Sequence, residues 1–316
     1  MKVLITGGTG FIGSHLCEQF ESLDAEVICL DNLSTSSVKN IENLRKTKFV
    51  LGDIKDSVLI NDLVSSVDLV IHLAAAVGVK TILNNPVESI QTNFVGSETV
   101  LHACNKFNKR VIIASTSEIY GKNLKQPLSE TDDRVMGAPQ KLRWSYADAK
   151  ALEESVAHSL FLRDGLRVTT VRFFNIVGPR QSSAYGMVLP NFIENAISNK
   201  PIRVFGSGNQ TRVFCHVKDV IEAMVKLINR EDTIGEVFNI GGSQEISMMD
   251  LAVKVKLILS SRSNIILEPY ENYYEAGFED MIKRTPDLRK LKSFITWQPK
   301  FDLDSIIRDI AKSYSK

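Results

Sequence analysis

The sequence predicts an α/β fold, a doubly wound parallel sheet followed by a smaller mixed α/β C-terminal domain. Two observations predict the sheet. Apolar segments of strand length alternate with helical patterns up to about residue 175, and a glycine cluster follows the first of these segments. Strands that are apolar throughout are typical of a parallel sheet covered by helices on both faces. This arrangement is the Rossmann type of fold.

The expected elements follow one another in regular order along the first half of the chain. Strands are expected at residues 2–6, 26–30, 48–51, 68–73, 110–115 and 167–174. Helices are expected between them at residues 13–22, 56–66, 88–107 and 145–164. Right-handed crossovers then place helices on both faces of the sheet. Ligands of such sheets bind beyond the carboxyl ends of the strands, so the residues after each strand are the functional candidates.

The regular order loosens after Gly178-Pro179. Short strands near 202–205 and 237–240 mix there with helices near 189–198, 217–229 and 247–260. We expect a first domain over residues 1–175 and a second over residues 176–316. Residues 212–241 are expected to return to the first domain and pack on its sheet.

Composition excludes several classes of function. The 316 residues are 44% hydrophobic and 24% charged, and the net charge of +1 gives no electrostatic reason to expect nucleic acid or an anionic membrane as partner. No run approaches the ~18 apolar residues of a membrane-spanning helix, and a strand at the N-terminus leaves no room for a signal peptide. The 4 cysteines form no C-x-x-C pair and the 5 histidines lack ligand spacing, which favours a cytoplasmic protein without a metal site.

The glycine cluster lies where the first strand meets the first helix. Gly8, Gly10 and Gly13 fit the G-x-G-x-x-G spacing, and Gly7 begins an overlapping G-x-x-G-x-x-G spacing. Both spacings bring backbone N–H groups and a helix N-terminus against a pyrophosphate. Asp31 ends the second strand, where a carboxylate commonly holds the adenosine ribose of a dinucleotide. A glycine-rich turn without a ligand is the alternative, but the strand, helix and Asp31 favour a dinucleotide site.

A second motif supplies groups for chemistry. Tyr146 and Lys150 form Y-x-x-x-K, a spacing that puts both side chains on one face of a helix. A nearby ammonium favours the phenolate, so the tyrosine can act as a base. Thr116 ends the fifth strand and can share a proton with Tyr146, and Glu118 adds a carboxylate. The alternative is a surface tyrosine beside a solvated lysine, with turn chemistry at the strand end.

Further motifs occur along nearly the whole chain. They are Thr6-Gly-Gly-Thr-Gly-Phe-Ile-Gly13, Asp31-Asn-Leu33, Gly52-Asp-Ile54, His72-Leu-Ala-Ala-Ala76, Asn93 with Gly96, Ser115-Thr-Ser-Glu-Ile-Tyr-Gly121, Tyr146 with Lys150, Arg172-Phe-Phe-Asn-Ile-Val-Gly-Pro-Arg180, Val204-Phe-Gly-Ser-Gly-Asn-Gln-Thr-Arg212 and His216-Val-Lys-Asp-Val220. With them the chain resembles the extended short-chain dehydrogenase/reductase family, the NAD-dependent nucleotide-sugar epimerases and dehydratases. This resemblance implies an NAD-binding first domain and a nucleotide-sugar-binding second domain.

The resemblance also implies roles for individual residues. The residues that would hold NAD are Gly7, Gly10, Phe11, Ile12, Asp31, Asn32, Asp53, Ile54, Leu73, Ala74, Ala75, Ser115, Tyr146, Lys150 and Phe173. The catalytic residues would be Tyr146, Lys150, Thr116, Ser117 and Glu118. The residues that would hold the substrate are Asn175, Arg180, Phe205, Arg212 and Arg284. Asp31 would repel a 2′-phosphate, which favours NAD over NADP.

The family oxidises a sugar hydroxyl, usually at C4, and the fate of the ketone differs between branches. A glutamate at 118 counts against a 4-epimerase, and Ser117 replaces the acid of the 4,6-dehydratases. Thr116-Ser-Glu118, Arg143-Trp144 and the stretch 273–280 leading to Arg284 resemble the UDP-glucuronate decarboxylase branch, although the loop 180–186 has no arginine after Arg180. A 4-dehydrogenase that releases its keto sugar fits too.

A non-catalytic relative that only senses NAD is the alternative outside enzymes, and the intact Tyr146 and Lys150 disfavour it. In this family the helices near 93–107 and 146–164 often pair across a two-fold axis. The resemblance therefore implies a homodimer, with a place in polysaccharide biosynthesis.

Overall fold

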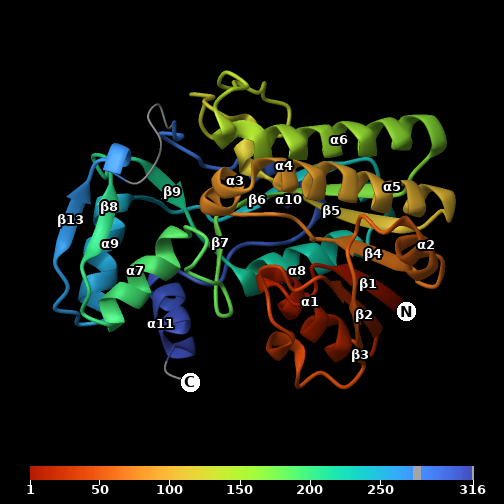
Figure 1. Cartoon of the computed structure of the whole chain (residues 1–316), viewed down its shortest axis with the longest axis horizontal. Coiled ribbons are helices and arrows are strands. Elements are labelled where there is room, and N and C mark those ends of the chain that lie inside the picture. Colours follow the sequence, from red (N-terminus) through yellow and green to blue (C-terminus); the bar gives the residue numbers. More distant parts are fainter. Residues whose placement is uncertain (273–278, 315–316) are drawn as a thin grey trace.

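The computed structural model describes residues 1–272 and 279–314 of the chain. A parallel sheet of seven strands forms its centre, in the order β11-β6-β5-β4-β1-β2-β3 (Figure 1). The strands are β1 (Lys2–Thr6), β2 (Glu26–Asp31), β3 (Thr47–Leu51), β4 (Leu69–His72), β5 (Arg110–Thr116), β6 (Val168–Phe174) and β11 (Val237–Gly241). The predicted doubly wound α/β fold is confirmed, and each strand expected in this sheet lies within one residue of its predicted bounds.

Helices cover both faces of the sheet (Figure 1). One face carries α1 (Phe11–Ser22), α8 (Val217–Ile228) and α10 (Arg289–Phe294), and the other carries α2 (Ser57–Ser65), α5 (Ser97–Lys106) and α6 (Ser145–Asp164). Alternate residues of a strand enter opposite cores: Val3 and Ile5 of β1 pack with α1 and α8, whereas Leu4 packs with α2 and α5. Both faces need apolar side chains, which is why these strands are apolar throughout.

The helix expected at 88–107 is present as one continuous run, but its middle is π-helical. The run consists of α4 (Pro86–Ile90), a π-helical stretch (Gln91–Gly96) and α5, and α3 (Val79–Asn84) precedes it. Asn93 lies in the π-helical stretch, and its side chain bonds both backbone groups of Ala76, at 2.7 Å to the nitrogen and 3.0 Å to the oxygen. The π-helical stretch therefore fixes the loop that follows β4.

The C-terminal part has its own core. It contains α7 (Val188–Ile197), β8 (Ile202–Phe205), α9 (Met248–Ile258), β13 (Ile265–Glu268) and α11 (Leu303–Ser313). Three small pairs complete it: β8 with β13, β9 (Thr211–Val213) with β12 (Glu245–Ser247), and β7 (Ile176–Val177) with β10 (Cys215–His216). The 3₁₀ turns are Val38–Ile41, Ser117–Tyr120, Leu142–Trp144, Glu231–Thr233 and Tyr270–Asn272.

The segment that returns from the C-terminal part joins the first sheet. β11 pairs in parallel with β6, and α8 packs beside α1. Within the described residues, no helix is long and apolar enough to cross a bilayer, and no group of His, Cys, Asp and Glu side chains is suited to a metal ion. All four cysteines are buried and unpaired.

Candidate active site

The predicted functional residues gather at the carboxyl edge of the sheet. Gly7 follows β1, Asp31 ends β2, Leu73 follows β4, Thr116 ends β5 and Asn175 follows β6. This edge is where ligands of doubly wound sheets bind.

The glycine loop is packed so tightly that side chains are excluded. Gly7 has φ +68°, and a Cβ there would lie 2.8 Å from the backbone nitrogen of Ala74. A Cβ on Gly13 would collide with the carbonyl oxygen of Gly7. α1 begins at Phe11, two residues earlier than expected, with Gly10 as its N-cap. The free amides of its first turn therefore face this edge and suit a pyrophosphate.

Asp31 joins the glycine loop to the segment after β2. Its carboxylate accepts hydrogen bonds from Thr9 N at 3.1 Å, Leu33 N at 2.9 Å and Ser36 Oγ at 3.1 Å. Carboxylate oxygens offer about four acceptor positions in all, so a ribose hydroxyl can still donate to Asp31. The amide of Asn32 donates to Asp53 at 3.2 Å, which brings together two more of the predicted cofactor residues.

The loop after β4 and the end of β5 complete a surface that fits a dinucleotide. Leu73 and Ala74 donate their backbone N–H groups to the hydroxyl of Thr6, each at 3.3 Å, which holds this loop beside Gly7. Ser115 Oγ is buried without a hydrogen-bond partner among the described residues. An unpaired buried hydroxyl is costly, so Ser115 is ready to bond a ligand. Together with the glycine cradle, it makes the residues present suitable for NAD.

Tyr146 and Lys150 lie on the first turns of α6 and are both buried, with 9% and 1% of their surface exposed. The alternative of a surface tyrosine beside a solvated lysine is therefore wrong. Burial raises the pKa of Tyr146, and the nearby carboxylates of Glu118 and Glu153 raise it further, whereas a hydrogen bond with Thr116 acts in the opposite direction. The phenol is thus protonated at neutral pH until positive charge arrives beside it.

Glu118 is held by two arginines. Both terminal nitrogens of Arg143 donate to its carboxylate, Nη2 at 2.9 Å, and Arg284 Nη1 donates at 3.2 Å. Burial alone would raise the pKa of Glu118, but the charges and hydrogen bonds of Arg143 and Arg284 lower it to about 2. Glu118 is therefore a carboxylate throughout the physiological range of pH.

Two further predicted residues join this group. Arg284 Nη2 donates to Asn175 Oδ1 at 2.9 Å, and Asn175 in turn donates to Val213 O at 2.9 Å. Arg212 lies on β9 and donates to Asp280 Oδ2 at 2.9 Å. Burial, helped by the charge of Arg212, lowers the pKa of Arg284 to about 10. Arg143, Arg212 and Arg284 thus share a small volume with the carboxylates of Glu118 and Asp280.

Phe205, at the end of β8, is stacked on Tyr270, with ring centroids 6.3 Å apart and planes 23° apart. Gly206 has φ +66°, and a Cβ there would lie 2.6 Å from the ring of Tyr270. Gln210 Nε2 donates to Phe205 O at 2.9 Å and to Tyr270 Oη at 3.2 Å. The chain therefore offers flat aromatic faces beside an amide at this end of the site.

Arg180 is placed differently from the other predicted substrate residues. It has φ +70°, and its guanidinium donates to Ser14 Oγ at 3.3 Å and Glu18 Oε2 at 2.8 Å, both on α1. The structure brings Arg180 to the helix of the glycine loop, whereas Asn175, Arg212 and Arg284 meet around Glu118 and Asp280.

Sequence reasoning missed Tyr270 and Glu153 of this site, and it included Asp280 only as the end of the stretch 273–280, without a role. Asp280 and Tyr270 reach it through the tertiary fold, and no spacing in the sequence signals that. Glu153 could have been found, since positions i and i+3 share a helix face and Lys150 is three residues earlier. Within the predicted stretch 273–280, residues 273–278 lie outside the described residues.

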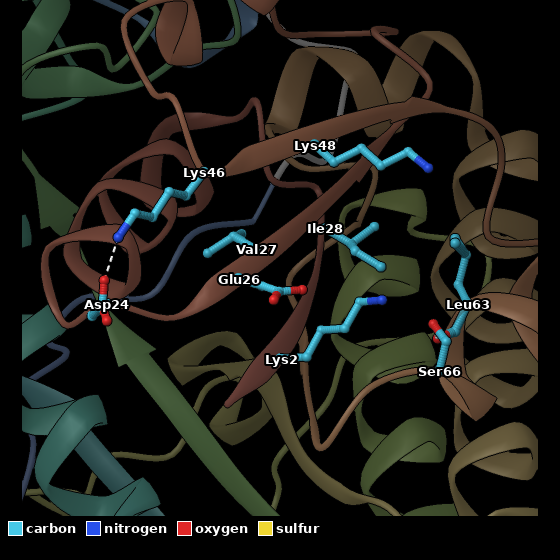
Figure 2. Close-up of a pocket in the computed structure, with 9 residues that line it drawn as sticks. All are labelled: Lys2, Asp24, Glu26, Val27, Ile28, Lys46, Lys48, Leu63 and Ser66. Atoms are coloured by element: carbon cyan, nitrogen blue, oxygen red, sulfur yellow. Dashed lines mark hydrogen bonds and ion pairs between the residues drawn. The ribbon is translucent and has the colours of Figure 1, made fainter.

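The hollow in Figure 2 lies away from this site. Its volume is about 660 Å³, and Lys2, Glu26, Lys46 and Lys48 are among the residues that line it. Lys2 and Glu26 begin β1 and β2, so the hollow opens at the amino ends of the strands, opposite the glycine loop. It takes no part in the chemistry described above.

Comparisons with known proteins agree with this geometry. The model of a family described as NAD dependent epimerase/dehydratase family matches residues 3–241. A UDP-N-acetyl-alpha-D-glucosaminuronate decarboxylase of Bacillus cytotoxicus is 41% identical over 98% of this chain and 96% of its own. UDP-glucuronic acid decarboxylase 1 of Arabidopsis thaliana is 32% identical over 96% of this chain and 67% of its own.

Solved structures of nucleotide-sugar epimerases are also similar to this chain. A UDP-glucose 4-epimerase of Thermotoga maritima with UDP-glucose has a TM-score of 0.90 and 29% identity, covering 100% of this chain and 99% of its own. A UDP-glucuronic acid 4-epimerase of Bacillus cereus, in complex with UDP-glucuronic acid and NAD, has a TM-score of 0.88 and 25% identity, covering 100% and 99%.

Proposed function

Because the chain belongs to the NAD-dependent epimerase/dehydratase family, we propose that it oxidises the C4 hydroxyl of a UDP-linked hexuronic acid and then releases the sugar carboxylate as CO₂. The chain is an NAD-dependent nucleotide-sugar enzyme, and its reaction begins with oxidation of a sugar hydroxyl. NAD, when bound, accepts the hydride from the sugar and later returns it. Between these two steps the sugar is a ketone at C4.

The observation that carries the proposal is the buried arginine group. Arg143, Arg212 and Arg284 lie together beside the carboxylates of Glu118 and Asp280, in a site shielded from water. A neutral hexose would leave the diphosphate as the only anionic group of the substrate for these arginines to meet. A hexuronic acid brings a second anionic group, and a guanidinium binds a carboxylate through two parallel hydrogen bonds. Arg284 is the best placed, because it already contacts both Asn175 and Glu118.

The chemistry follows from the position of the carboxylate. Tyr146 takes the proton of the C4 hydroxyl, with Thr116 orienting the phenol through a hydrogen bond. We assign to the ammonium of Lys150, four residues along the same helix face, the role of favouring the phenolate. The C4 ketone makes the C6 carboxylate a β-keto acid. The C5–C6 bond breaks and CO₂ leaves. The electron pair of the broken bond forms an enolate over C5, C4 and the C4 oxygen. C5 then takes a proton from water, and Tyr146 returns its proton when the ketone is reduced.

The state of Glu118 argues against elimination of water. A 4,6-dehydratase needs a carboxylic acid to protonate the departing hydroxyl, and the two arginines that lower the pKa of Glu118 to about 2 keep it ionised. Ser117 stands at the neighbouring position, and a serine is far too weak an acid for this step. Elimination therefore lacks a proton donor.

Epimerisation is the rival outcome, because a UDP-glucuronic acid 4-epimerase is structurally similar to this chain. A 4-epimerase must turn its keto sugar over so that hydride returns to the opposite face. Contacts of Arg284 with the sugar carboxylate and of Arg212 with the diphosphate would oppose that turn.

The remaining assignments belong to the same proposal. We assign residues 1–175, with 212–241, to the NAD-binding domain and 176–316 to the nucleotide-sugar-binding domain. Phe205 and Tyr270 are assigned to the uracil ring, which has a flat face for stacking. NAD is preferred over NADP because Asp31 repels a 2′-phosphate. Arg180, given its contacts with α1, braces the glycine loop.

We also propose that the enzyme is a cytoplasmic homodimer whose product enters polysaccharide biosynthesis. α5 and α6 lie side by side on one face (Figure 1), and Leu152 and Leu162 of α6 are 52% and 70% exposed. Exposed leucines nearly three turns apart on one helix suit a helix-pair interface. Light scattering coupled to size exclusion tests the dimer, and a monomeric mass at micromolar concentration contradicts it.

The direct test is incubation of the enzyme and NAD with UDP-, GDP-, dTDP- and CDP-linked hexoses and hexuronic acids, read by mass spectrometry. The proposal predicts loss of CO₂ from a UDP-hexuronic acid. Loss of water, loss of two hydrogens or an epimer of unchanged mass would each contradict it. UDP-glucuronic acid and its 2-acetamido analogue are the first substrates to compare, because relatives of both specificities are similar to this chain.

A further inference from the structure

A buried glutamate lies beside the lysine of the Y-x-x-x-K motif. Lys150 Nζ donates to Glu153 Oε2 at 2.7 Å, and each side chain has 1% of its surface exposed. The two residues are three positions apart on α6, so they share its inner face. A buried carboxylate is costly unless it is paired and hydrogen-bonded, so Glu153 needs an explanation that the chemistry described above does not give.

A hydrogen-bond chain through the core leads to Glu153, and its direction can be worked out. Thr6 Oγ1 accepts from two backbone amides, so its own proton goes to His72 Nδ1, 2.7 Å away. Burial lowers the pKa of His72 to about 3, so the ring is neutral and carries its single proton on Nε2. Nε2 then donates to Ser97 Oγ at 2.9 Å. The Ser97 hydroxyl is left to donate to Glu153.

Every donor in this series of hydrogen bonds points toward Glu153. The series begins at the amides of Leu73 and Ala74, in the loop that lies against the glycines, and runs from β1 and β4 through α5 to α6. Hydrogen bonds aligned in this way polarise one another and favour negative charge at the acceptor end. Lys150 and the Ser97 hydroxyl both favour the ionised form of Glu153, against burial, which is the larger effect and raises its pKa.

We propose that Glu153 is a positioning residue for the reaction: its carboxylate fixes the direction of the Lys150 ammonium beside Tyr146, and the hydrogen-bond chain from Thr6 through His72 and Ser97 holds that carboxylate in place. This proposal rests on the roles proposed above for Tyr146 and Lys150. An ammonium has three N–H groups. With one given to Glu153, the other two are directed by the pair and remain for Tyr146 and a cofactor ribose.

The charged groups around this pair come from several elements. Glu154 lies beside Glu153 on α6, Glu118 follows β5, Arg284 comes from the C-terminal segment, and His72 of β4 is neutral. Glu118 and Glu153 both raise the pKa of Tyr146. The negative charge of Glu153 therefore has two effects: it fixes the direction of the Lys150 ammonium, and it delays ionisation of the phenol until positive charge arrives with the cofactor.

Removing the charge of Glu153 shifts activity toward lower pH. In Glu153→Gln, a phenol freed of one neighbouring carboxylate ionises at lower pH, so the acid limb of the pH profile moves down. We expect the optimum of kcat/KM, followed as NAD-dependent oxidation of the sugar, to fall by about one pH unit or more.

Glu154→Gln is the matched control, because it makes the same chemical change one position along the same helix. Glu154 pairs with Arg172 at 3.0 and 2.7 Å instead of with Lys150, so its variant should keep the wild-type optimum. An E153Q enzyme that loses rate evenly at every pH, with an unmoved optimum, would overturn the proposal, since that is what a structural role alone produces.

Glu153→Asp adds a second test that does not depend on the glutamine variant folding. It keeps the charge with a shorter reach, so the rate should fall while the optimum stays within about half a pH unit of wild type. A shifted optimum in E153D contradicts the proposal, and thermal unfolding of each variant identifies one that does not fold. Tyr146→Phe separates the two proposals: if that variant keeps its activity, the assigned roles of the motif fail, whatever the profile of E153Q.

Discussion

Replacing Glu118 by glutamine tests the charge group at the centre of the site. The shape of the side chain is kept and its charge is removed. The pKa of Glu118 falls from 4.5 to about 2 on folding, and at 1.36 kcal/mol per pH unit this corresponds to about 3 kcal/mol of stability. The side chain is 15% exposed, so solvent screening reduces this figure little. Breaking a buried ion pair by removing one partner costs a similar amount, about 3 to 5 kcal/mol.

The sign of the pH dependence follows from the lowered pKa. Because the folded value lies below the unfolded one, the stabilisation is fully present above pH 4.5 and is lost as the pH falls toward about 2. We therefore expect Glu118→Gln to unfold with a free energy lower by about 3 kcal/mol at pH 7. The difference from wild type should narrow as the pH falls below 4.5.

Urea unfolding followed by circular dichroism measures this difference. Glu231→Gln is the control, since Glu231 makes an ion pair with Arg167 at the surface, with side chains 76% and 38% exposed. Such pairs contribute about 1 kcal/mol or less. If E118Q unfolds within the range of E231Q, the reasoning about a buried charge group is refuted. The same variant should lose decarboxylation, because Arg143 and Arg284 lose the carboxylate that orients them.

Four other residues give further predictions. Tyr146→Phe should lower turnover by about 10²- to 10⁴-fold while NAD binding, measured by calorimetry, is retained; full activity would remove the tyrosine as the base. Arg284→Met should lower kcat/KM for a UDP-hexuronic acid by about 10²-fold without changing NAD affinity, and unchanged kinetics would place the carboxylate elsewhere. Asp31→Ala should weaken the binding of NAD by about tenfold and reduce the preference for NAD over NADP, measured by titrating the variant with each cofactor. His72 cannot take a proton when folded, because burial lowers its pKa from 6.5 to about 3; wild-type stability should therefore fall below pH 6.5, and this slope should flatten in His72→Gln, as urea unfolding at pH 7 and pH 5 would reveal.

The sheet could be predicted closely because all its strands meet the same requirement, which is burial on both faces. Val3, Leu4 and Ile5 must all be apolar, since neighbours in the strand enter opposite cores, and this produces the continuous apolar runs that the sequence displays. The glycine loop could be predicted equally well, because the contacts of Gly7 and Gly13 tolerate no Cβ. In both cases a local pattern and a tertiary requirement coincide.

The less predictable elements depend on partners far along the chain. The region 88–107 was expected as a regular helix, but the stretch Gln91–Gly96 within it is π-helical, and the loop contact of Asn93 explains why. β13 and α11 were not expected, because β13 is short and half-exposed and finds its place only by pairing with β8. Their apolar residues signal burial without indicating what covers them.

The site shows the same division. Tyr146 and Lys150 were predicted from helical spacing, and the fold buries both. The partners of the arginines could not be predicted: Arg212 meets Asp280 across 68 positions and Arg284 meets Glu118 across 166. Glu153 is the exception, a missed residue that helical spacing alone could have revealed.

Decarboxylation through a C4 ketone is the central claim, and one measurement tests it most directly. UDP-glucuronic acid, or its 2-acetamido analogue, labelled with carbon-13 at C6, is turned over with NAD in heavy water, and carbon and proton spectra are recorded. The account predicts labelled CO₂ and bicarbonate together with a UDP-pentose that carries solvent deuterium at C5. A labelled carbon that stays on the sugar, whether the product is a C4 epimer or a stable keto acid, would contradict it.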